Sequence, residues 1–363
     1  MLLKNTISYM KILWLGPVVN KETEKEIKAI SPAANRWQYN FIRALKHNDV
    51  NVINISHITE SSWPRGRFFV DSSTSKLKDI KQITVNYLNF YFLREISISF
   101  TTISKIFKYR KNEYDYIFTY NESLRNKIVA LFFKLIFKKP WISILADGRT
   151  SGKSDLVLFL SEDYYRRYDK KKYLLEGGIE SFIKSDETDM TYSENYLLYA
   201  GSMTEVTGIV DFIKKYSLLD IKNELHLYGK PTKEVVELSK TNPKIILKGF
   251  VSDEELDQAC NKAFAFINPR GDNEESNNTF PSKLLLYLRY RKPIISYKSS
   301  GIPSKFNDVL IYYNNEDELE KILNNLNTIE REKYSNKIEK FQRVNSWNFL
   351  VRIFTNKLDD IIK

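Results

Sequence analysis

Short apolar runs alternate with amphipathic stretches at the start of the chain. Apolar residues dominate 11–19, a helix-like pattern runs from Ser31-Pro32 to about residue 47, and a second apolar run covers 50–56. A short apolar run bounded by turn residues predicts a buried strand, whereas apolar positions three and four apart predict a helix. Serine followed by proline is a typical helix start. The pattern therefore predicts a strand, a helix and a strand, which is the first unit of a doubly wound parallel sheet.

The same alternation continues through the first half of the chain. Strands are expected at 114–120, 141–146 and 155–161, and a helix is expected at 123–138. The aromatic and β-branched residues between 71 and 110 fit either element by periodicity. Helices are the expectation there, because the next strand of Rossmann-like character begins only at residue 114.

A second series of alternating elements follows a polar tract at 184–194, which has the composition of a linker. Strands are expected at 196–200, 224–228, 244–248 and 264–267, and helices at 209–216 and 253–262. The last segment, 346–362, has one apolar face and predicts an amphipathic helix. The repetition concerns whole domains, since no short repeat is present.

Length and composition fit two domains. A chain of 363 residues with 42% hydrophobic residues exceeds one domain of about 150 residues and can bury sizeable cores. No uncharged run reaches the roughly 18 residues of a membrane span, and no secretory signal pattern is visible, so a cytoplasmic location is expected. The single cysteine, Cys260, excludes a disulfide framework, and three scattered histidines do not form a typical metal cluster.

The net charge of +11 favours an anionic partner. A nucleotide sugar and an anionic membrane surface both fit, and so does a lysine-rich composition without functional meaning. Nucleic acid is not expected, because the lysines spread along the whole chain and no motif with aromatic platforms is present. The apolar run at 128–139 ends in two lysines. It can lie on an anionic membrane or pack as a core helix, and the core helix is favoured.

Polar residues gather between 263 and 296, where an apolar strand ends and a helix begins. The strand stops at Asn-Pro-Arg (268–270), and the helix starts after Phe-Pro-Ser-Lys (280–283). Ligands of open α/β sheets bind beyond the carboxyl ends of strands, and a helix start offers unpaired amides to an anion. The segment therefore predicts half of a phosphate or nucleotide site.

Together with Lys-Pro-Ile-Ile-Ser at 292–296, these motifs resemble the donor-site segment of retaining GT-B glycosyltransferases of family four. The resemblance implies an α/β fold of two Rossmann-like domains that face each other across a cleft, with a C-terminal helix crossing back to the N-terminal domain. The acceptor domain is expected at 1–183 together with the helix 346–363. The linker is expected at 184–194 and the donor domain at 195–345.

The resemblance implies that the donor diphosphate contacts Gly201, Ser202, Arg270, Ser282 and Lys283. Fixed cations and helix amides stabilise the charge that develops on a departing nucleoside diphosphate. No metal or other cofactor is expected, and no Asp-x-Asp metal motif is present. A plain β–α turn is the alternative for Gly201, and a surface or interdomain salt bridge is the alternative for Arg270.

The nucleobase is expected to lie beside residues that end neighbouring strands, namely Tyr228, Gly229, Phe250 and Val251. By resemblance, backbone groups at these positions read the edge of the base. Ordinary core packing is a strong alternative for Phe250.

The chain departs from the family pattern at three positions. Leu286 stands where a helix glutamate usually binds the ribose hydroxyls, Asn278 stands where many members have a second glutamate, and Thr207 stands where related sequences often have lysine. Leucine cannot accept a hydrogen bond, so ribose recognition is expected to be altered. A catalytically inactive relative is one consequence that the sequence leaves open.

The acceptor is expected on the N-terminal domain, at Ser31, Asn35 and Asn121. Two carboxylates are catalytic candidates. Asp147 follows a strand and could orient or deprotonate an acceptor hydroxyl, although an Asp-Gly turn explains it equally well. Glu275 could reach the donor sugar, although its spacing does not match the family pattern.

The resemblance implies a metal-independent, retaining hexosyltransferase that moves a sugar from a nucleotide-diphosphate sugar to a glycan or a lipid-linked acceptor. Bacterial surface polysaccharide synthesis, such as that of O-antigen or capsule, is the expected setting, in the cytoplasm or peripherally on the inner face of the plasma membrane. Three alternatives remain at this stage: a nucleotide-sugar epimerase, a sugar phosphorylase and a non-catalytic GT-B subunit.

Overall fold

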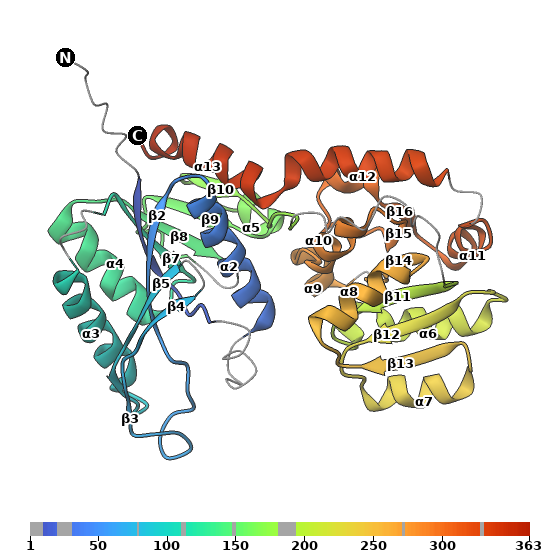
Figure 1. Cartoon of the computed structure of the whole chain (residues 1–363), viewed down its shortest axis with the longest axis horizontal. Coiled ribbons are helices and arrows are strands. Elements are labelled where there is room, and N and C mark those ends of the chain that lie inside the picture. The colour runs from blue at the N-terminus through green and yellow to red at the C-terminus, as the bar shows by residue number, and fades with distance from the viewer. Residues whose placement is uncertain are drawn as a thin grey trace. The chain divides into compact units, whose positions relative to one another are not determined.

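A computed structural model describes residues 10–19, 31–77, 80–109, 114–146, 150–180, 194–270, 273–326 and 330–363. The chain forms two compact units (Figure 1). The first unit comprises Met1–Leu160, Tyr164–Gly177 and Trp347–Lys363, and the second comprises Ser161–Asp163 and Gly178–Ser346. Except for Glu194, the expected linker at 184–194 lies outside the described residues.

The first unit is built on an eight-stranded sheet with the order β10-β9-β8-β7-β1-β2-β5-β4. Its strands are β1 (Lys11–Leu15), β2 (Asn51–His57), β4 (Thr74–Leu77), β5 (Ile80–Val85), β7 (Tyr116–Tyr120), β8 (Trp141–Leu145), β9 (Leu156–Phe159) and β10 (Lys172–Leu174). All neighbours pair in parallel except β4 and β5. The chain order reverses between β1 and β7, which makes this the topological switch point of the sheet.

Helices cover both faces of this sheet (Figure 1). They are α2 (Pro32–His47) and α13 (Trp347–Ile362) on one face and α3 (Arg94–Lys108) and α4 (Leu124–Phe137) on the other. Side chains alternate along β1, so Ile12 and Trp14 enter the core under α2 and α13, and Leu13 and Leu15 enter the core under α3 and α4. The buried runs of the sequence are therefore strands packed on both faces, as parallel sheets require.

Two expectations about helices of the first unit are confirmed. The Ser31 hydroxyl caps α2 by accepting from the Ala34 amide, with proline in the first turn. The C-terminal helix α13 buries Trp347, Phe354 and two further apolar residues in the core of the first unit. Because that core comes mainly from the first 160 residues, the chain returns to its first unit at its end.

The expectation of helices between 71 and 110 is confirmed for the run at 96–103, which lies in α3, and is wrong for the run at 87–93 and for the residues before it. The structure has the strands β4 and β5, a two-stranded antiparallel sheet of β3 (Phe69–Val70) and β6 (Tyr87–Leu88), and then α3. Strand β5 pairs with β2 in parallel and is buried on both faces, from Gln82 to Val85. Periodicity alone does not separate helix from strand in so short a run, whereas its β-branched residues favour a strand and pairing with β2 fixes that conformation.

The second unit has a six-stranded, all-parallel sheet with the order β13-β12-β11-β14-β15-β16. Its strands are β11 (Tyr196–Ala200), β12 (Glu224–Tyr228), β13 (Ile245–Gly249), β14 (Ala265–Asn268), β15 (Ile294–Tyr297) and β16 (Ile311–Tyr313). Counted along the unit, this is the Rossmann order 3-2-1-4-5-6. The switch point lies between β11 and β14, and the strands expected from the sequence agree within a residue or two.

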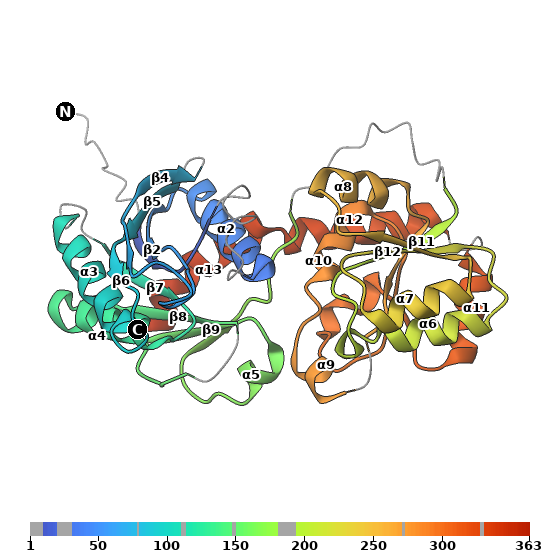
Figure 2. The ribbon, with the colours of Figure 1, turned by 90° about the horizontal axis from the view of Figure 1, so that it is seen from below.

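Helices also cover both faces of the second sheet (Figure 2). One face carries α6 (Ile209–Leu218), α7 (Lys233–Thr241) and α11 (Glu316–Asn324). The other carries α8 (Asp253–Lys262), α10 (Lys283–Tyr287) with the 3-10 turn η2 (Leu288–Tyr290), and α12 (Arg331–Asn345). Shorter elements are α5 (Glu162–Arg166), η1 (Glu205–Thr207), α9 (Glu274–Asn278) and η3 (Ser304–Val309). None of the described helices is long and apolar enough to cross a membrane.

Candidate functional site

The ends of β11 and β12 approach each other closely because both continue in glycine. The Gly201 amide donates to the Tyr228 carbonyl at 2.9 Å, and the Gly229 amide donates to the Gly249 carbonyl at 2.7 Å. Gly201 has φ +147 and Gly229 has φ +130, and a Cβ on Gly229 would lie 2.1 Å from the Gly201 carbonyl oxygen. Only glycine fits this arrangement, which leaves bare backbone at the carboxyl edge of the sheet.

Lys283 lies beneath the Gly201 backbone. A Cβ on Gly201 would lie 3.3 Å from Lys283 Nζ, and this ammonium lies 3.9 Å from the centre of the Tyr199 ring. Burial, together with the nearby Arg270 charge, lowers the pKa of Lys283 to about 7. The first α/β loop of the unit therefore has a cation directly behind it that a bound anion would hold in its charged form.

Arg270 shapes the polar loop that follows β14. Its Nη2 donates to the carbonyls of Ser276 and Thr279, at 3.0 and 2.9 Å. The Ser276 hydroxyl donates in turn to the Val206 carbonyl at 2.9 Å, which ties α9 to the loop after β11. The two loops of the switch point are thus joined, and Arg270 contributes positive charge beside Lys283.

The two predicted serines are exposed at this edge. The Ser202 carbonyl accepts from the Tyr199 hydroxyl at 2.5 Å and from the Thr207 hydroxyl at 3.1 Å. Thr207, where relatives often have lysine, therefore fixes the loop conformation. Ser282 stands at the start of α10, and its side chain does not cap that helix.

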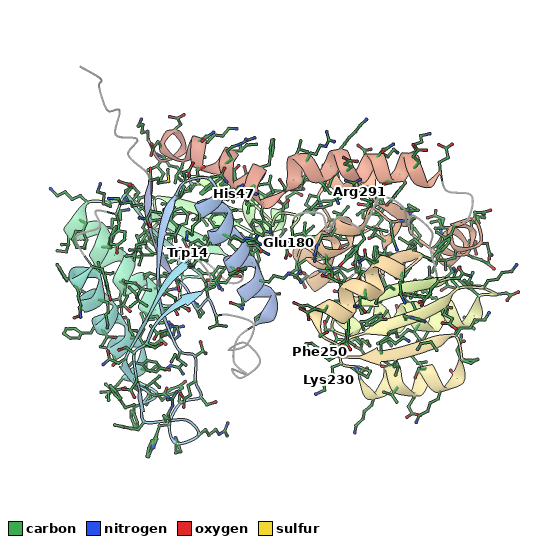
Figure 3. All side chains as sticks on the ribbon, in the orientation of Figure 1. Trp14, His47, Glu180, Lys230, Phe250 and Arg291 are labelled. Atoms are coloured by element: carbon green, nitrogen blue, oxygen red, sulfur yellow. The ribbon has the colours of Figure 1, made fainter. Side chains whose placement is uncertain are left out.

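The four residues predicted beside the nucleobase differ in environment. Phe250 follows β13 and is 89% exposed, so the core-packing alternative is wrong for this residue. Figure 3 shows Phe250 and Lys230 at the same edge of the second sheet. Tyr228 is buried, and Val251 packs partly buried against the same core cluster as Leu286. The Tyr228 carbonyl and the Gly229 amide already hold strand ends together, as described above.

A cavity of about 310 Å³ lies at the switch point of the first sheet. It brings together the three predicted acceptor residues, Ser31, Asn35 and Asn121. The Asn35 amide exchanges two hydrogen bonds of 3.0 Å with the backbone of Val19. Asn121 has φ 56 and accepts from the Ala146 amide at 2.9 Å. Both asparagines therefore shape the cavity wall as well as line it.

His57 lines the same cavity and was not among the residues singled out from the sequence. It is buried at the end of β2, and its Nε2 has no hydrogen-bond partner among the described residues. Burial, with the nearby Arg125 and Arg94 charges, holds the pKa of His57 well below its usual value. The imidazole is therefore neutral at pH 7, so its Nε2 can accept a hydrogen bond when the other ring nitrogen carries the proton.

Arg125 is the second residue of this cavity that the sequence did not single out. Its Nη1 forms an ion pair with Glu95 at 2.5 Å, which links α4 to α3. Its Nε is buried without a hydrogen-bond partner among the described residues. Position in the sequence is the signal that could have identified both residues as site candidates. His57 ends β2 and Arg125 follows β7, and both places lie at the carboxyl edge of the sheet.

The two predicted catalytic carboxylates cannot be placed. Asp147 lies outside the described residues, and Glu275 lies in α9 with its side chain outside the described part. Among the residues that are described, no group of three or more His, Cys, Asp or Glu side chains could hold a metal ion.

Comparisons with known proteins identify the second unit. A family model described as "Glycosyl transferases group 1" matches residues 194–328. No curated protein sequence matches the chain.

Solved structures match over nearly the whole chain. The sucrose-phosphate synthase from Thermosynechococcus elongatus has a TM-score of 0.65 at 12% identity, covering 97% of this chain and 98% of that one. The lipopolysaccharide outer core galactosyltransferase WaaB has a TM-score of 0.63 at 16% identity, covering 96% and 100%. The Anabaena protein HepE, solved with UDP and glucose, has a TM-score of 0.61 at 14% identity, covering 97% and 99%.

The strand orders, the glycine-lined switch point and these structural matches define the class as GT-B, with two Rossmann-like units. The fold class and the resemblance inferred from the sequence are confirmed. The chain has the GT-B fold, and its residues 194–328 match the family model of group 1 glycosyl transferases.

Proposed function

We propose that this chain is a retaining glycosyltransferase that moves a sugar from a nucleotide-diphosphate sugar to a glycan or a lipid-linked acceptor. One observation carries the proposal: Lys283, Arg270 and the bare Gly201 backbone converge at the switch point of the group 1 domain. This is where open α/β sheets bind their ligands. Two of the similar structures were solved with UDP or a UDP-sugar analogue, which supports a nucleotide-sugar donor.

The chemistry requires stabilisation of the departing nucleoside diphosphate. The bond between the anomeric carbon and the diphosphate oxygen breaks, the electron pair stays on that oxygen, and a new bond forms to the acceptor oxygen. Lys283 in its charged form and the Arg270 charge oppose the negative charge that develops on the phosphates. By resemblance, the leaving phosphate takes the proton of the acceptor hydroxyl. The proposal therefore needs neither a metal nor a strong base.

The acceptor would bind in the cavity of the first unit. Its size suits part of a sugar acceptor, and polar side chains line it, among them Ser31, Asn121 and Asn126. The free Nε2 of His57 would accept a hydrogen bond from an acceptor hydroxyl, and the Nε of Arg125 would donate to an acceptor oxygen.

The setting that we propose is bacterial surface polysaccharide synthesis, of the O-antigen or capsule kind, on the cytoplasmic side of the inner membrane. The similarity to a lipopolysaccharide galactosyltransferase and the net charge of +11 support it. A lipid-linked acceptor would bring the enzyme into contact with an anionic membrane. No nucleic-acid partner is proposed.

Thermal-shift measurements with UDP, GDP, ADP, CMP and dTDP compounds test the donor site. We expect one nucleoside diphosphate to raise the melting temperature, and Arg270→Ala to weaken that effect more for the diphosphate than for the nucleoside. Equal loss for both would remove Arg270 from the phosphate site. With the stabilising donor, the anomeric configuration of the product then distinguishes retention from inversion.

Leu286 favours a second candidate, a non-catalytic GT-B subunit. The family's helix carboxylate is absent at this position, and Leu286 instead packs against an apolar cluster. This candidate predicts that none of the nucleotides stabilises the protein. If a nucleotide stabilises the protein but no sugar is transferred, an epimerised nucleotide sugar would favour the epimerase. Cleavage of a glycoside by inorganic phosphate would favour the phosphorylase.

A further inference from the structure

The first unit exposes many large apolar side chains in one part of its sequence. From the segment before β3 to the end of α3, the exposed ones are Trp63, Phe68, Phe69, Leu88, Phe90, Tyr91, Phe92, Leu93, Ile96, Phe100 and Phe107. We call this set the aromatic face. Among the described residues of the second unit, the large apolar side chains exposed to solvent are only Leu218, Phe250 and Val344. The aromatic face is therefore a local feature and not a property of the whole surface.

Helix α3 has two apolar sides. Ile98 and Ile106 are buried in the core, whereas Ile96, Phe100 and Phe107 are exposed. The exposed residues follow helical spacing, so they form one stripe along the helix. A helix that packs on one side and needs only solubility on the other would carry polar residues there. The stripe instead indicates that something apolar covers it.

Ring contacts join some of these residues into two groups, one around Trp63 and one around Phe107. Trp63 contacts Phe68 and Phe90, with ring centres 6.2 and 6.1 Å apart. Phe107 contacts Phe132 of α4 at 5.8 Å, which extends the surface to the exposed residues of that helix. Those residues are Leu124, Ile128, Leu135 and Ile136. Exposed apolar side chains gathered in this number on neighbouring elements mark an interaction site in most proteins.

The charge around the aromatic face is mostly positive: its first segment carries Arg65, Arg67 and Asp71, and Arg67 is paired with Glu60. Helices α3 and α4 carry the basic residues Arg94, Lys105, Lys108, Arg125, Lys127 and Lys134, and Lys138 and Lys139 follow α4 directly. Two of the basic residues on these helices are already paired, Arg125 with Glu95 and Lys134 with Asp155. Lysine and arginine can keep their charges in water while their aliphatic stems lie along apolar surface. This charge pattern complements a surface that is apolar inside and negative outside.

We propose that the aromatic face and the adjoining side of α4 dock on an anionic lipid bilayer. Tryptophan and tyrosine favour the headgroup region, phenylalanine and isoleucine enter the acyl boundary, and basic side chains attract anionic headgroups. This surface is much larger than the apolar run at 128–139, which on its own is partly a core helix with Val129, Ala130 and Phe133 buried.

Docking also has a consequence for the acceptor. Ile98 and Thr102 of α3 and Arg125 of α4 line the cavity of the first unit, so the docking helices form part of the acceptor wall. A lipid-linked acceptor could then be presented to the cavity while its lipid stays in the bilayer. Only this consequence rests on the proposed function, because docking requires no transferase activity.

Vesicle co-sedimentation tests the proposal. We expect the protein to sediment with vesicles of phosphatidylcholine and phosphatidylglycerol, less with phosphatidylcholine alone, and less at high salt. Phe92→Ser combined with Phe100→Gln should lower the partition coefficient about tenfold or more, because these side chains are 77% and 74% exposed and would bury in lipid. Leu218→Gln, at an 81% exposed site of the second unit, is the matched control and should bind as the native chain does.

Three outcomes would overturn docking: native protein that stays in the supernatant, a double variant that binds unchanged, or a control that loses binding equally. Light scattering addresses a second copy of the chain as the occupant. If the native protein forms a dimer and does not bind lipid, and the double variant is a monomer, the aromatic face would be assigned to self-association. Circular dichroism and nucleotide-dependent stabilisation check that the variant is folded. If the protein binds nucleotide but not vesicles, the donor-site proposal holds and the docking proposal fails. If it binds vesicles but not nucleotide, the docking proposal holds and the donor-site proposal fails.

Discussion

At the scale of single residues, Lys283 has an unusual combination of position and environment. Its ammonium is buried against the Tyr199 ring and adjoins the Gly201 backbone. No carboxylate pairs with it among the described side chains, and the cost of burying this charge appears as a pKa lowered to about 7. Such a lysine suits an anion-binding site, because a bound anion raises the lysine pKa and so restores its charged form.

Nucleoside diphosphate affinity should therefore fall as pH rises through 7. The free protein has a Lys283 pKa of about 7, and a bound diphosphate raises it, so binding takes up a proton above pH 7. Isothermal titration at pH values on both sides of 7 measures this effect. Lys283→Arg should remove the decline in affinity, since arginine stays charged. The phosphate of the ligand also titrates near pH 6, but this effect is the same for both proteins. A decline that persists in Lys283→Arg would assign the proton to another group.

Lys283 should also destabilise the folded protein below pH 7. Its pKa is lowered from 10.5 in the unfolded chain, so the unfolded state binds more protons between pH 7 and 10.5. The penalty is complete below pH 7 and disappears as pH rises towards 10.5. Lys283→Met should raise the melting temperature most at low pH, and the difference from the native protein should shrink in alkaline buffer. A gain that does not depend on pH would contradict a charge effect.

At the scale of elements, α10 shows how one helix carries both the resemblance and the departure. Its first residue, Lys283, is proposed to contact the donor phosphates, and three residues later Leu286 packs against the same apolar cluster as Val251. By resemblance, a carboxylate at position 286 would bind the ribose hydroxyls. The helix proposed to bind the diphosphate therefore keeps its lysine, while the position expected to contact the ribose is apolar.

Leu286→Glu should tighten nucleoside diphosphate binding about tenfold, because charge-assisted hydrogen bonds contribute roughly 1.5–3 kcal/mol. Leu286→Gln is the control of equal size without the charge and should gain less. Titration calorimetry of both variants with the stabilising nucleotide checks the prediction. No gain in Leu286→Glu would mean that the ribose does not approach this side of α10.

At the scale of the whole molecule, the C-terminal helix α13 completes a core that begins near the start of the chain. Phe354 contacts Phe41 and Phe118 in this core, and Trp347 stacks edge-on against Trp37. The five tryptophans of the chain, at positions 14, 37, 63, 141 and 347, all belong to the first unit. Tryptophan fluorescence therefore reports the stability of the first unit alone.

Phe354→Ala should destabilise the first unit by about 3–5 kcal/mol, the usual cost of a cavity left by a buried aromatic ring. Urea unfolding followed by tryptophan fluorescence measures the shift. Leu319→Ala, a fully buried residue of the second unit, is the control and should leave the fluorescence transition in place. Equal shifts in the two variants would mean that the units unfold as one.

The sequence alone determined the alternation of strands and helices, the helix start at Ser31 and the start of a helix after Phe280-Pro281-Ser282, because these depend on local periodicity and on residue types at fixed spacing. Only the tertiary structure decided the rest. The free edge of β2 turned the run at 80–85 into a strand, and the sheet's switch point brought His57 and Arg125 to the cavity with Ser31. It also buried Lys283 and exposed the aromatic face. Burial depends on which elements cover a residue, and that is set by contacts distant in sequence.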